Sequence, residues 1–167
     1  TVDSSFGTAA GINASSLAGS TVDNSGAITA TASKYAFGVL ANTSQGDTVV
    51  DNSGSISTDG KYSFGVLAQS GDGNATLYNS GAIAAVGKYA YGTTVASNYG
   101  DAAIFNAEDG SLSAYSGDLL AVGAFANANN DGNASIDNAG TISAGGAGYG
   151  QLAYRAAVLV GARGALV

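Results

Sequence analysis

A short motif returns along this chain at a fixed distance. The segment KYAFGVLA at residues 34–41 reappears as KYSFGVLA at 61–68 and begins again as KYAYG at 88–92, an advance of 27 residues each time. A period of about 20 to 50 residues is the mark of a solenoid or repeat array, in which stacked neighbours bury the apolar side that one repeat cannot bury alone. The repeat therefore constrains the architecture more than any other feature of the sequence.

Composition is consistent with a folded repeat protein. The chain has 167 residues, of which 46% are hydrophobic and only 10% are charged. A disordered chain would lack this apolar content and would not keep its apolar residues in register from repeat to repeat. We expect one domain over residues 1–167, with repeats over 1–148 and a final coil, cap or assembly segment over 149–167.

A second motif, Asn-Ser-Gly or Asn-Ala-Gly, lies between the copies of the first. When the repeats are aligned on its Asn, apolar residues fall into two columns. The residues two positions before the Asn are Val22, Val50, Leu77, Ile104 and Ile136. Those four positions after it are Ile28, Ile56, Ile83, Leu112 and Ile142, where Leu112 fits once a two-residue insertion at 108–109 is allowed.

Each repeat contains three short segments in which apolar and small polar residues alternate, for example 37–41, 48–52 and 55–58. Such alternation predicts strands, and the Gly, Asn, Asp and Ser residues between the segments predict turns. Three strands and three corners in 27 residues describe one coil of a parallel β-helix. The prediction is an all-β parallel β-helix of roughly five to six coils, with neighbouring coils about 4.8 Å apart.

The Asn residues of the second motif should lie one above another in such a stack. Each side-chain amide can then donate to the side-chain oxygen of the next, and each bond contributes about 1 kcal/mol net. The alternative is a set of exposed turn residues without a ladder. The glycine two positions later is expected to supply a left-handed or otherwise strained backbone. The predicted ladder is Asn24, Asn52, Asn79, Asn106 and Asn138, and the predicted turn glycines are Gly26, Gly54, Gly81 and Gly140.

From about Phe6 to Tyr149, the alternation of Asn-Ser-Gly-Xaa-Ile with Tyr/Phe-Gly-Val-Xaa-Ala resembles the repeats of bacterial autotransporter passenger domains and related adhesins. The resemblance implies a right-handed parallel β-helix, secretion, and adhesion or surface assembly. The chain departs from that pattern in being short for a passenger domain, and from the sequence as given we expect no C-terminal membrane barrel of the kind such proteins carry, either because it is a processed fragment or because it is a stand-alone subunit.

Surface contacts are expected along two columns of the repeat. The lysines should form a solvated row, which either protects a sheet edge or meets the Asp column (Asp23, Asp51 and Asp137) of a neighbouring molecule. If the Phe and Val residues of the first motif face inward, the leucines form an exposed apolar strip. The tyrosines should stack, and sugar binding is the alternative. The candidate lateral contacts are Lys34, Lys61, Lys88, Leu40 and Leu67.

The two ends of the stack are the predicted sites of self-association. The first five residues, TVDSS, resemble TVDNS at 21–25 and should already form coil, while 156–167 is strongly apolar. Uncapped coil ends favour head-to-tail stacking into open filaments. Val2, Leu166 and Val167 are the residues expected at these contacts.

Several chemistries have no support in the sequence. His and Cys are absent, and Asp47 and Asp101 are separated by a repeat that carries Asn74, so no catalytic residues and no cofactor are predicted. The segments 71–74 and 130–133 suggest at most weak Ca²⁺ binding. The net charge of −7 disfavours nucleic acid and anionic membranes as partners, and no apolar run is long enough to insert into a membrane.

These observations predict a non-catalytic, extracellular structural protein of a bacterial surface. It would act as a β-solenoid module of an adhesin or of a head-to-tail filament, with itself and surface glycans as partners. The alternative is a carbohydrate-binding or polysaccharide-degrading β-helix.

Overall fold

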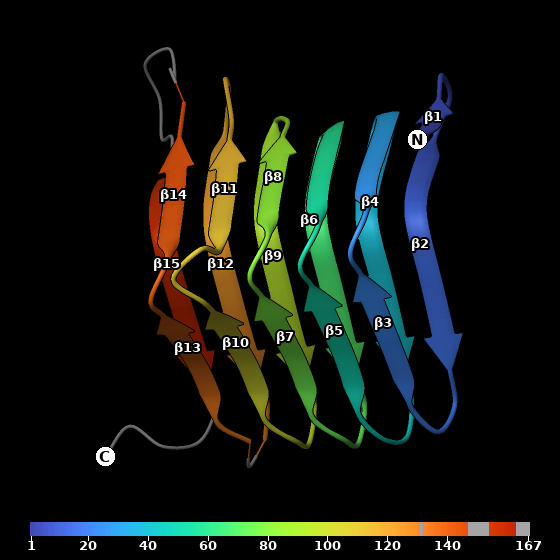
Figure 1. Ribbon diagram of the computed structural model, residues 1–167, viewed down its shortest axis with the longest axis vertical. Helices are drawn as coiled ribbons and strands as arrows, with labels where there is room; N and C mark the ends of the chain where they lie inside the picture. Colours follow the sequence, from blue (N-terminus) through green and yellow to red (C-terminus); the bar gives the residue numbers. More distant parts are fainter. Residues whose placement is uncertain (131, 147–153, 163–167) are drawn as a thin grey trace.

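The computed structural model describes residues 1–130, 132–146 and 154–162. Within these ranges every regular element is a β-strand, and the strands pair in parallel. They stack as a β-solenoid of about five coils, with equivalent positions about 27 residues apart (Figure 1). The predicted all-β parallel solenoid is confirmed.

Each coil contributes one strand segment to each of three faces. Strands β4 (Ala27–Thr43) and β6 (Ser55–Ser70) turn a corner and belong to face 1 with their first halves and to face 2 with their second halves. Face 1 also holds β1 (Val2–Ser4), β8 (Ala82–Val86), β11 (Ser111–Tyr115) and β14 (Thr141–Gly145). Face 2 also holds β2 (Thr8–Ser16), β9 (Tyr89–Ser97), β12 (Leu120–Ala128) and β15 (Tyr154–Ala162). Face 3 consists of β3 (Ser20–Asn24), β5 (Thr48–Asn52), β7 (Ala75–Asn79), β10 (Ala102–Asn106) and β13 (Ala134–Asn138).

The register follows the columns of the repeat. On face 3, Ile104 lies opposite Leu77 on one side and Ile136 on the other. The insertion at 108–109 is absorbed in the loop between β10 and β11, so that Leu112 lies opposite Ile83 and Ile142. A loop that changes length without shifting the strands keeps the two apolar columns on the inner side of the coil.

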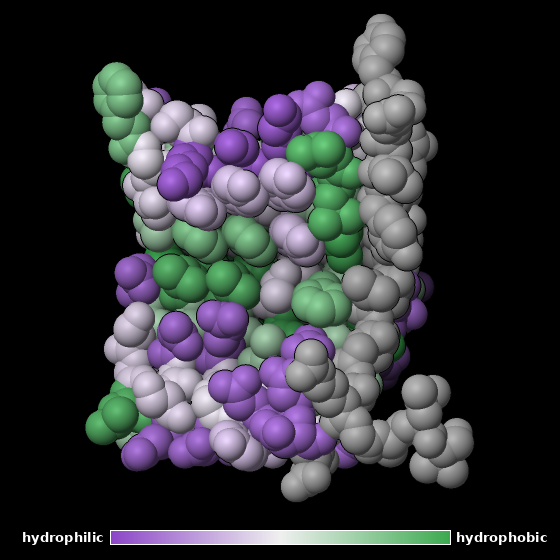
Figure 2. Space-filling model, turned by 180° about the vertical axis from the view of Figure 1, so that it is seen from behind, coloured by the Kyte–Doolittle hydropathy of each residue, from purple (hydrophilic) through white to green (hydrophobic). Residues whose placement is uncertain are grey.

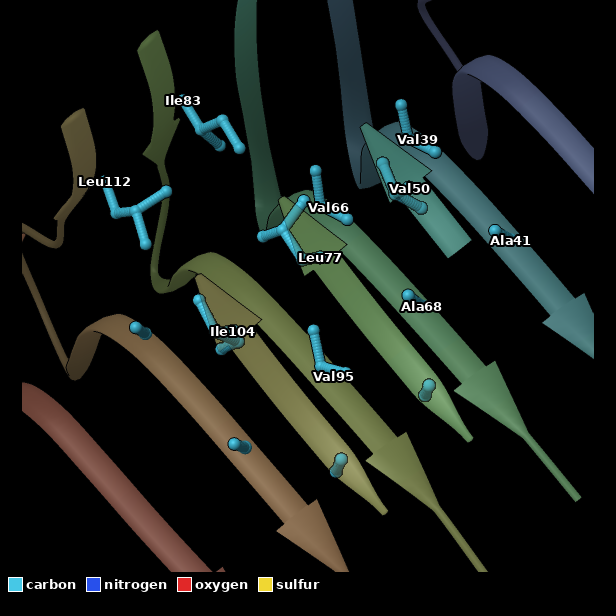
Figure 3. Packing of buried hydrophobic residues seen from close by; sticks show 14 of the residues in the cluster. Val39, Ala41, Val50, Val66, Ala68, Leu77, Ile83, Val95, Ile104 and Leu112 are labelled. Atoms are coloured by element: carbon cyan, nitrogen blue, oxygen red, sulfur yellow. The ribbon is translucent and has the colours of Figure 1, made fainter. Parts of the chain in front are cut away.

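The core is formed by apolar columns that point inward from all three faces (Figure 3). Val50, Leu77 and Ile104 on face 3 are fully buried, as are Val39 and Val66 on face 2. Burial of one such side chain contributes about 1.5–3 kcal/mol. The stacked columns therefore supply the main stabilising term of a chain that has no Cys and, over its described residues, no helix.

The phenylalanines of the first motif do not face the core. Phe37 and Phe64 are only half-buried and stack on each other outside face 2, whereas Val39 and Val66 are buried. The expectation that all four point inward assumed strict alternation. The alternation breaks at Gly38, because Gly38 and Val39 are neighbours and both are buried. Before this break the buried residues of β4 are even-numbered, so Phe37 faces outward although it lies two residues from Val39.

The first residues do form coil, but not at the position that their sequence suggests. Strand β1 pairs with β4 on face 1, where Val2 lies opposite Ala30 and Ser4 opposite Ala32. Residues 21–24 of the similar segment belong instead to β3 on face 3. The position of the first residues is determined by backbone pairing with β4, on which β2 also pairs, and not by their four identities with residues 21–25.

At the other end, β15 pairs with β12 along face 2. Leu166 and Val167 lie outside the described residues. Across 1–130, 132–146 and 154–162, no helix has the length and apolar character needed to cross a membrane.

Candidate functional site

The Asn residues at the corner between faces 3 and 1 form a continuous column of hydrogen bonds. The Nδ2 atom of Asn24 donates to Oδ1 of Asn52 over 2.7 Å, and Asn52 donates in the same way to Asn79 over 2.8 Å. Asn79 donates to Asn106, and Asn106 to Asn138, each over 2.7 Å. Every rung has the same polarity, because the donor always belongs to the earlier coil.

A second bond fixes each amide in its own corner. Asn52 Nδ2 also donates to the carbonyl oxygen of Gly54 over 3.2 Å, and Asn79 Nδ2 donates to that of Gly81 over 3.0 Å. The middle members of the column are almost fully buried, with Asn52 at 0% and Asn79 at 2% exposure. A buried amide whose donors and acceptor are all engaged stabilises one register and penalises others.

The corner glycines serve close packing between coils and not a left-handed backbone. Among the described residues, the glycines with positive φ are Gly7 and Gly46. The prediction of a left-handed backbone at the corner glycines is therefore wrong. A Cβ atom on Gly54 would instead collide with the carbonyl oxygen of Gly26, and one on Gly81 with that of Gly54. Only glycine lets successive corners stack this closely.

Gly110 is a fifth corner glycine that the sequence comparison missed. It accepts a hydrogen bond from Asn106 Nδ2 over 3.2 Å, as Gly54 does from Asn52. The insertion moves it four residues after its Asn, in place of two. The signal was present in the sequence, because the same insertion brings Leu112 into its column.

A second polar column runs along the corner between faces 2 and 3. The Oδ1 atom of Asp47 accepts a bond from the backbone N–H of Asn74, and Asn74 Oδ1 accepts one from Asp101, each over 2.8 Å. Asp101 Oδ1 continues the column to the N–H of Asn133 over 2.8 Å. Asp and Asn alternate here because only an acceptor oxygen is needed. These carboxylates thus serve as corner ties, and Asp47 and Asp101 remain separated by Asn74.

Aromatic rings stack along the outside of face 2. The ring centroids of Tyr35 and Tyr62 are 4.9 Å apart, and those of Tyr62 and Tyr89 are also 4.9 Å apart. A parallel column joins Phe37, Phe64 and Tyr91, whose neighbouring centroids lie 5.3 and 5.0 Å apart. Because the rings lie nearly parallel to one another, the inner members of both columns present edges to solvent while neighbouring rings cover their faces.

Lysines line the edge of these columns. Lys34 Nζ lies 5.1 Å from the Tyr35 ring centroid, and Lys61 Nζ lies 5.5 Å from that of Tyr62, within the range of cation–π attraction. The register of β4 and β6 shifts here, so that Ser33 and Lys34 together lie opposite Lys61. Lys88 departs from the pattern and approaches Asp118 at 3.4 Å; both side chains are about half exposed.

Leu40 and Leu67 lie opposite each other and are half-buried beside the aromatic columns. Together with the rings they form an apolar band on the outside of face 2. Figure 2, which views the solenoid from the side of β9 and β12, shows such a band between hydrophilic margins.

Metal chemistry has no preformed geometry in the part of the chain that the structure describes. No group of three His, Cys, Asp or Glu side chains there could hold a metal ion. In the segment 71–74, Gly73 N–H donates to Ser70 Oγ over 3.0 Å, and the Asn74 oxygen accepts the N–H of Asp101. The polar groups expected to bind Ca²⁺ weakly thus make turn contacts.

The fold defines this protein as a parallel β-solenoid whose outer surface carries ordered columns. Comparisons with protein-family models, with curated proteins and with solved structures found no match.

Proposed function

We propose that this protein is a non-catalytic structural module of a bacterial surface, either part of an adhesin or the subunit of a head-to-tail filament. The observation that carries the proposal is the polarity of the Asn column. Asn138 Nδ2 donates to Gly140, and the second N–H of this amide has no acceptor among the described residues. At the opposite end, Asn24 Oδ1 accepts the N–H of Gly26 and no other donor from the described part of the chain.

These two ends are complementary. A further coil placed after Asn138 would accept a hydrogen bond from the second N–H of its amide. A coil placed before Asn24 would donate one to Asn24 Oδ1, as Asn24 itself donates to Asn52. The same bond that joins coils within one molecule can therefore join coils of two molecules. Such a contact is heterologous and leads to open filaments.

The composition supports an exposed, mechanical role. Cys is absent, charges are few, and the stability comes from backbone ladders, side-chain columns and an apolar core. Secretion to the bacterial surface and autotransporter-like adhesion follow from the resemblance of the repeats and belong to this proposal.

The alternative of a carbohydrate-binding or polysaccharide-degrading protein has less support. Sugar binding on aromatic residues uses open ring faces, and the inner rings of face 2 cover one another. Glycoside hydrolysis needs paired carboxylates, and the Asp47 and Asp101 side chains hold backbone N–H groups. A glycan array combined with turnover assays on acidic polysaccharides tests this alternative, and a bound and cleaved glycan would overturn the structural role.

Electron microscopy of the protein and of Asn138→Asp tests the stacking. Aspartate retains the oxygen that accepts from Asn106 but loses the outward N–H, so we expect filaments for the parent and their loss in the variant. Asn42→Asp adds the same charge at an exposed position between two neighbouring strands, away from the coil ends, and should leave the filaments intact. Only dispersed particles of the parent, even at high concentration, would refute the filament.

A further inference from the structure

Charge is divided between two faces of the solenoid. The face 2 segments 8–16, 35–43, 62–70, 89–97 and 120–128 contain no Asp or Glu, and Lys34, Lys61 and Lys88 line their edge. The five strands of face 3 contain no Lys or Arg and carry Asp23, Asp51 and Asp137 on their outer side. With a net charge of −7, a chain with evenly spread charges would simply repel its copies. This division instead makes one face attractive to the other.

Face 2 combines cations with an apolar surface. Its aromatic columns and the Leu40–Leu67 pair are half-buried. The ammonium groups of Lys34 and Lys61 lie over the rings of the tyrosines that follow them, Tyr35 and Tyr62. In the described part of the chain these two lysines form no salt bridge, whereas Lys88 is paired with Asp118. The band has the character of an interface centre: aromatic, poor in acidic groups and bordered by charge.

Face 3 carries the complementary features. Asp23 and Asp51 lie opposite each other on adjacent strands, where like charges repel. Both line a surface hollow of about 350 Å³ together with Ser53. Further along the same column, Tyr78 and Phe105 stack at 5.1 Å and remain 46% and 39% exposed. The face therefore offers an acidic socket beside an exposed aromatic pair.

We propose that face 2 of one molecule docks against face 3 of a second copy. Lys34 and Lys61 enter the hollow beside Asp23 and Asp51 and relieve the repulsion between those carboxylates. Tyr78 and Phe105, which follow Asp51 along the same column, then pack against the tyrosine column beside the lysines. The two faces match in spacing because both repeat once per coil, at about 4.8 Å. The contact joins solenoids side by side, uses no coil end, and goes beyond the head-to-tail stacking proposed above.

The experiment is charge exchange between the two faces, followed by sedimentation velocity. The parent and all variants in this experiment carry Asn138→Asp, which removes head-to-tail stacking. The result therefore does not depend on whether the filament proposed above exists. We compare this parent with Lys34→Glu/Lys61→Glu, with Asp23→Lys/Asp51→Lys, and with an equimolar mixture of the two. The control is Asp3→Lys/Asp59→Lys, which makes the same charge change as the second variant on exposed residues of face 1.

We expect concentration-dependent association of the parent and the control, weakened between about 0.05 and 0.5 M salt. Each exchanged variant alone should associate at least about tenfold more weakly, and the mixture should recover association because each face again meets its opposite charge. The recovery also shows that the variants are folded. A monomeric parent, association that is indifferent to both exchanges, or a mixture that does not recover overturns the proposal. Binding of heparin through Lys34 and Lys61 by a parent that does not self-associate would overturn it in favour of a polyanion.

Discussion

The side-chain nitrogen of Asn52 lies 2.8 Å from the side-chain oxygen of Asn79, one coil further along the solenoid. Both side chains are buried, so neither has water as an alternative partner. The net contribution of one such bond is about 1 kcal/mol, but a buried amide left without its partner costs about 1–3 kcal/mol. The pair therefore acts mainly against slippage, because any shift of one coil against the next would leave both amides unpaired.

Replacing Asn79 by Ala should destabilise the fold by about 2–4 kcal/mol. The substitution removes the bonds to Asn106 and Gly81 and leaves the Asn52 N–H unpaired in the interior. Asn138→Ala is the matched control at the exposed end of the column and should cost about 1 kcal/mol or less. Urea unfolding measures both. Equal effects for the two variants would show that burial of the ladder contributes nothing.

Gly65 should not tolerate even a methyl group. A Cβ atom there would collide with Cγ2 of Ile83 and with the backbone oxygen of Gly92 in the next coil. Backbone cannot yield as a flexible side chain does, so we expect Gly65→Ala to cost at least about 2 kcal/mol. At Gly117 the same atom would meet nothing within 4 Å, and Gly117→Ala should leave the thermal midpoint unchanged or slightly raised. A neutral Gly65→Ala would contradict the close approach of the coils.

Tyr91 should make stability depend on pH in the alkaline range. Burial, with a smaller contribution from Tyr89, raises the pKa of Tyr91 above the ordinary value of 10.0. The folded state thus holds this phenolic proton more tightly than the unfolded chain does. The stabilisation is fully present below pH 10.0 and is lost as the pH rises through the folded-state pKa.

Tyr91→Phe tests this, because Phe64 already occupies the preceding position of the same ring column. Between about pH 9 and 11.5 the unfolding free energy of the variant should fall less steeply than that of the wild type. An absorbance titration of the folded variant should lack one phenol that ionises above pH 10.0 in the wild type. Identical alkaline profiles would contradict the effect of burial.

The repeat was readable from sequence wherever a side chain has one role in every coil. The inward Ile and Leu columns and the Asn corners keep fixed offsets, because displacement of any member would open the core or unpair an amide. Even the insertion before Leu112 could be recognised, since the apolar position returns after it.

The errors occurred where backbone geometry overrides the pattern of letters. Phe37 looked like core because it lies two residues from Val39, but the phase change at Gly38 turns its ring outward. The repeat pattern predicts an unusual φ at the corner glycines, but what excludes a side chain there is the backbone of the adjacent coil. The tie from Asp47 to the N–H of Asn74 was missed as well, because its partner is a backbone group that carries no sequence signal.

Thr93 offers a test of the core from the opposite direction. It occupies the column of Val66 and Ala124 and is fully buried, yet its hydroxyl oxygen has no hydrogen-bond partner among the described residues. Valine has nearly the same shape and buries no polar atom. We therefore expect Thr93→Val to stabilise the protein by about 1–2 kcal/mol in urea unfolding.

Thr48→Val is the matched control. The buried Thr48 hydroxyl donates to the carbonyl oxygen of Gln69 over 2.7 Å, so the same substitution should destabilise by about 1 kcal/mol. Destabilisation by both variants would mean that Thr93 has a polar partner in solution and that the centre of the solenoid is wetter than its apolar columns indicate.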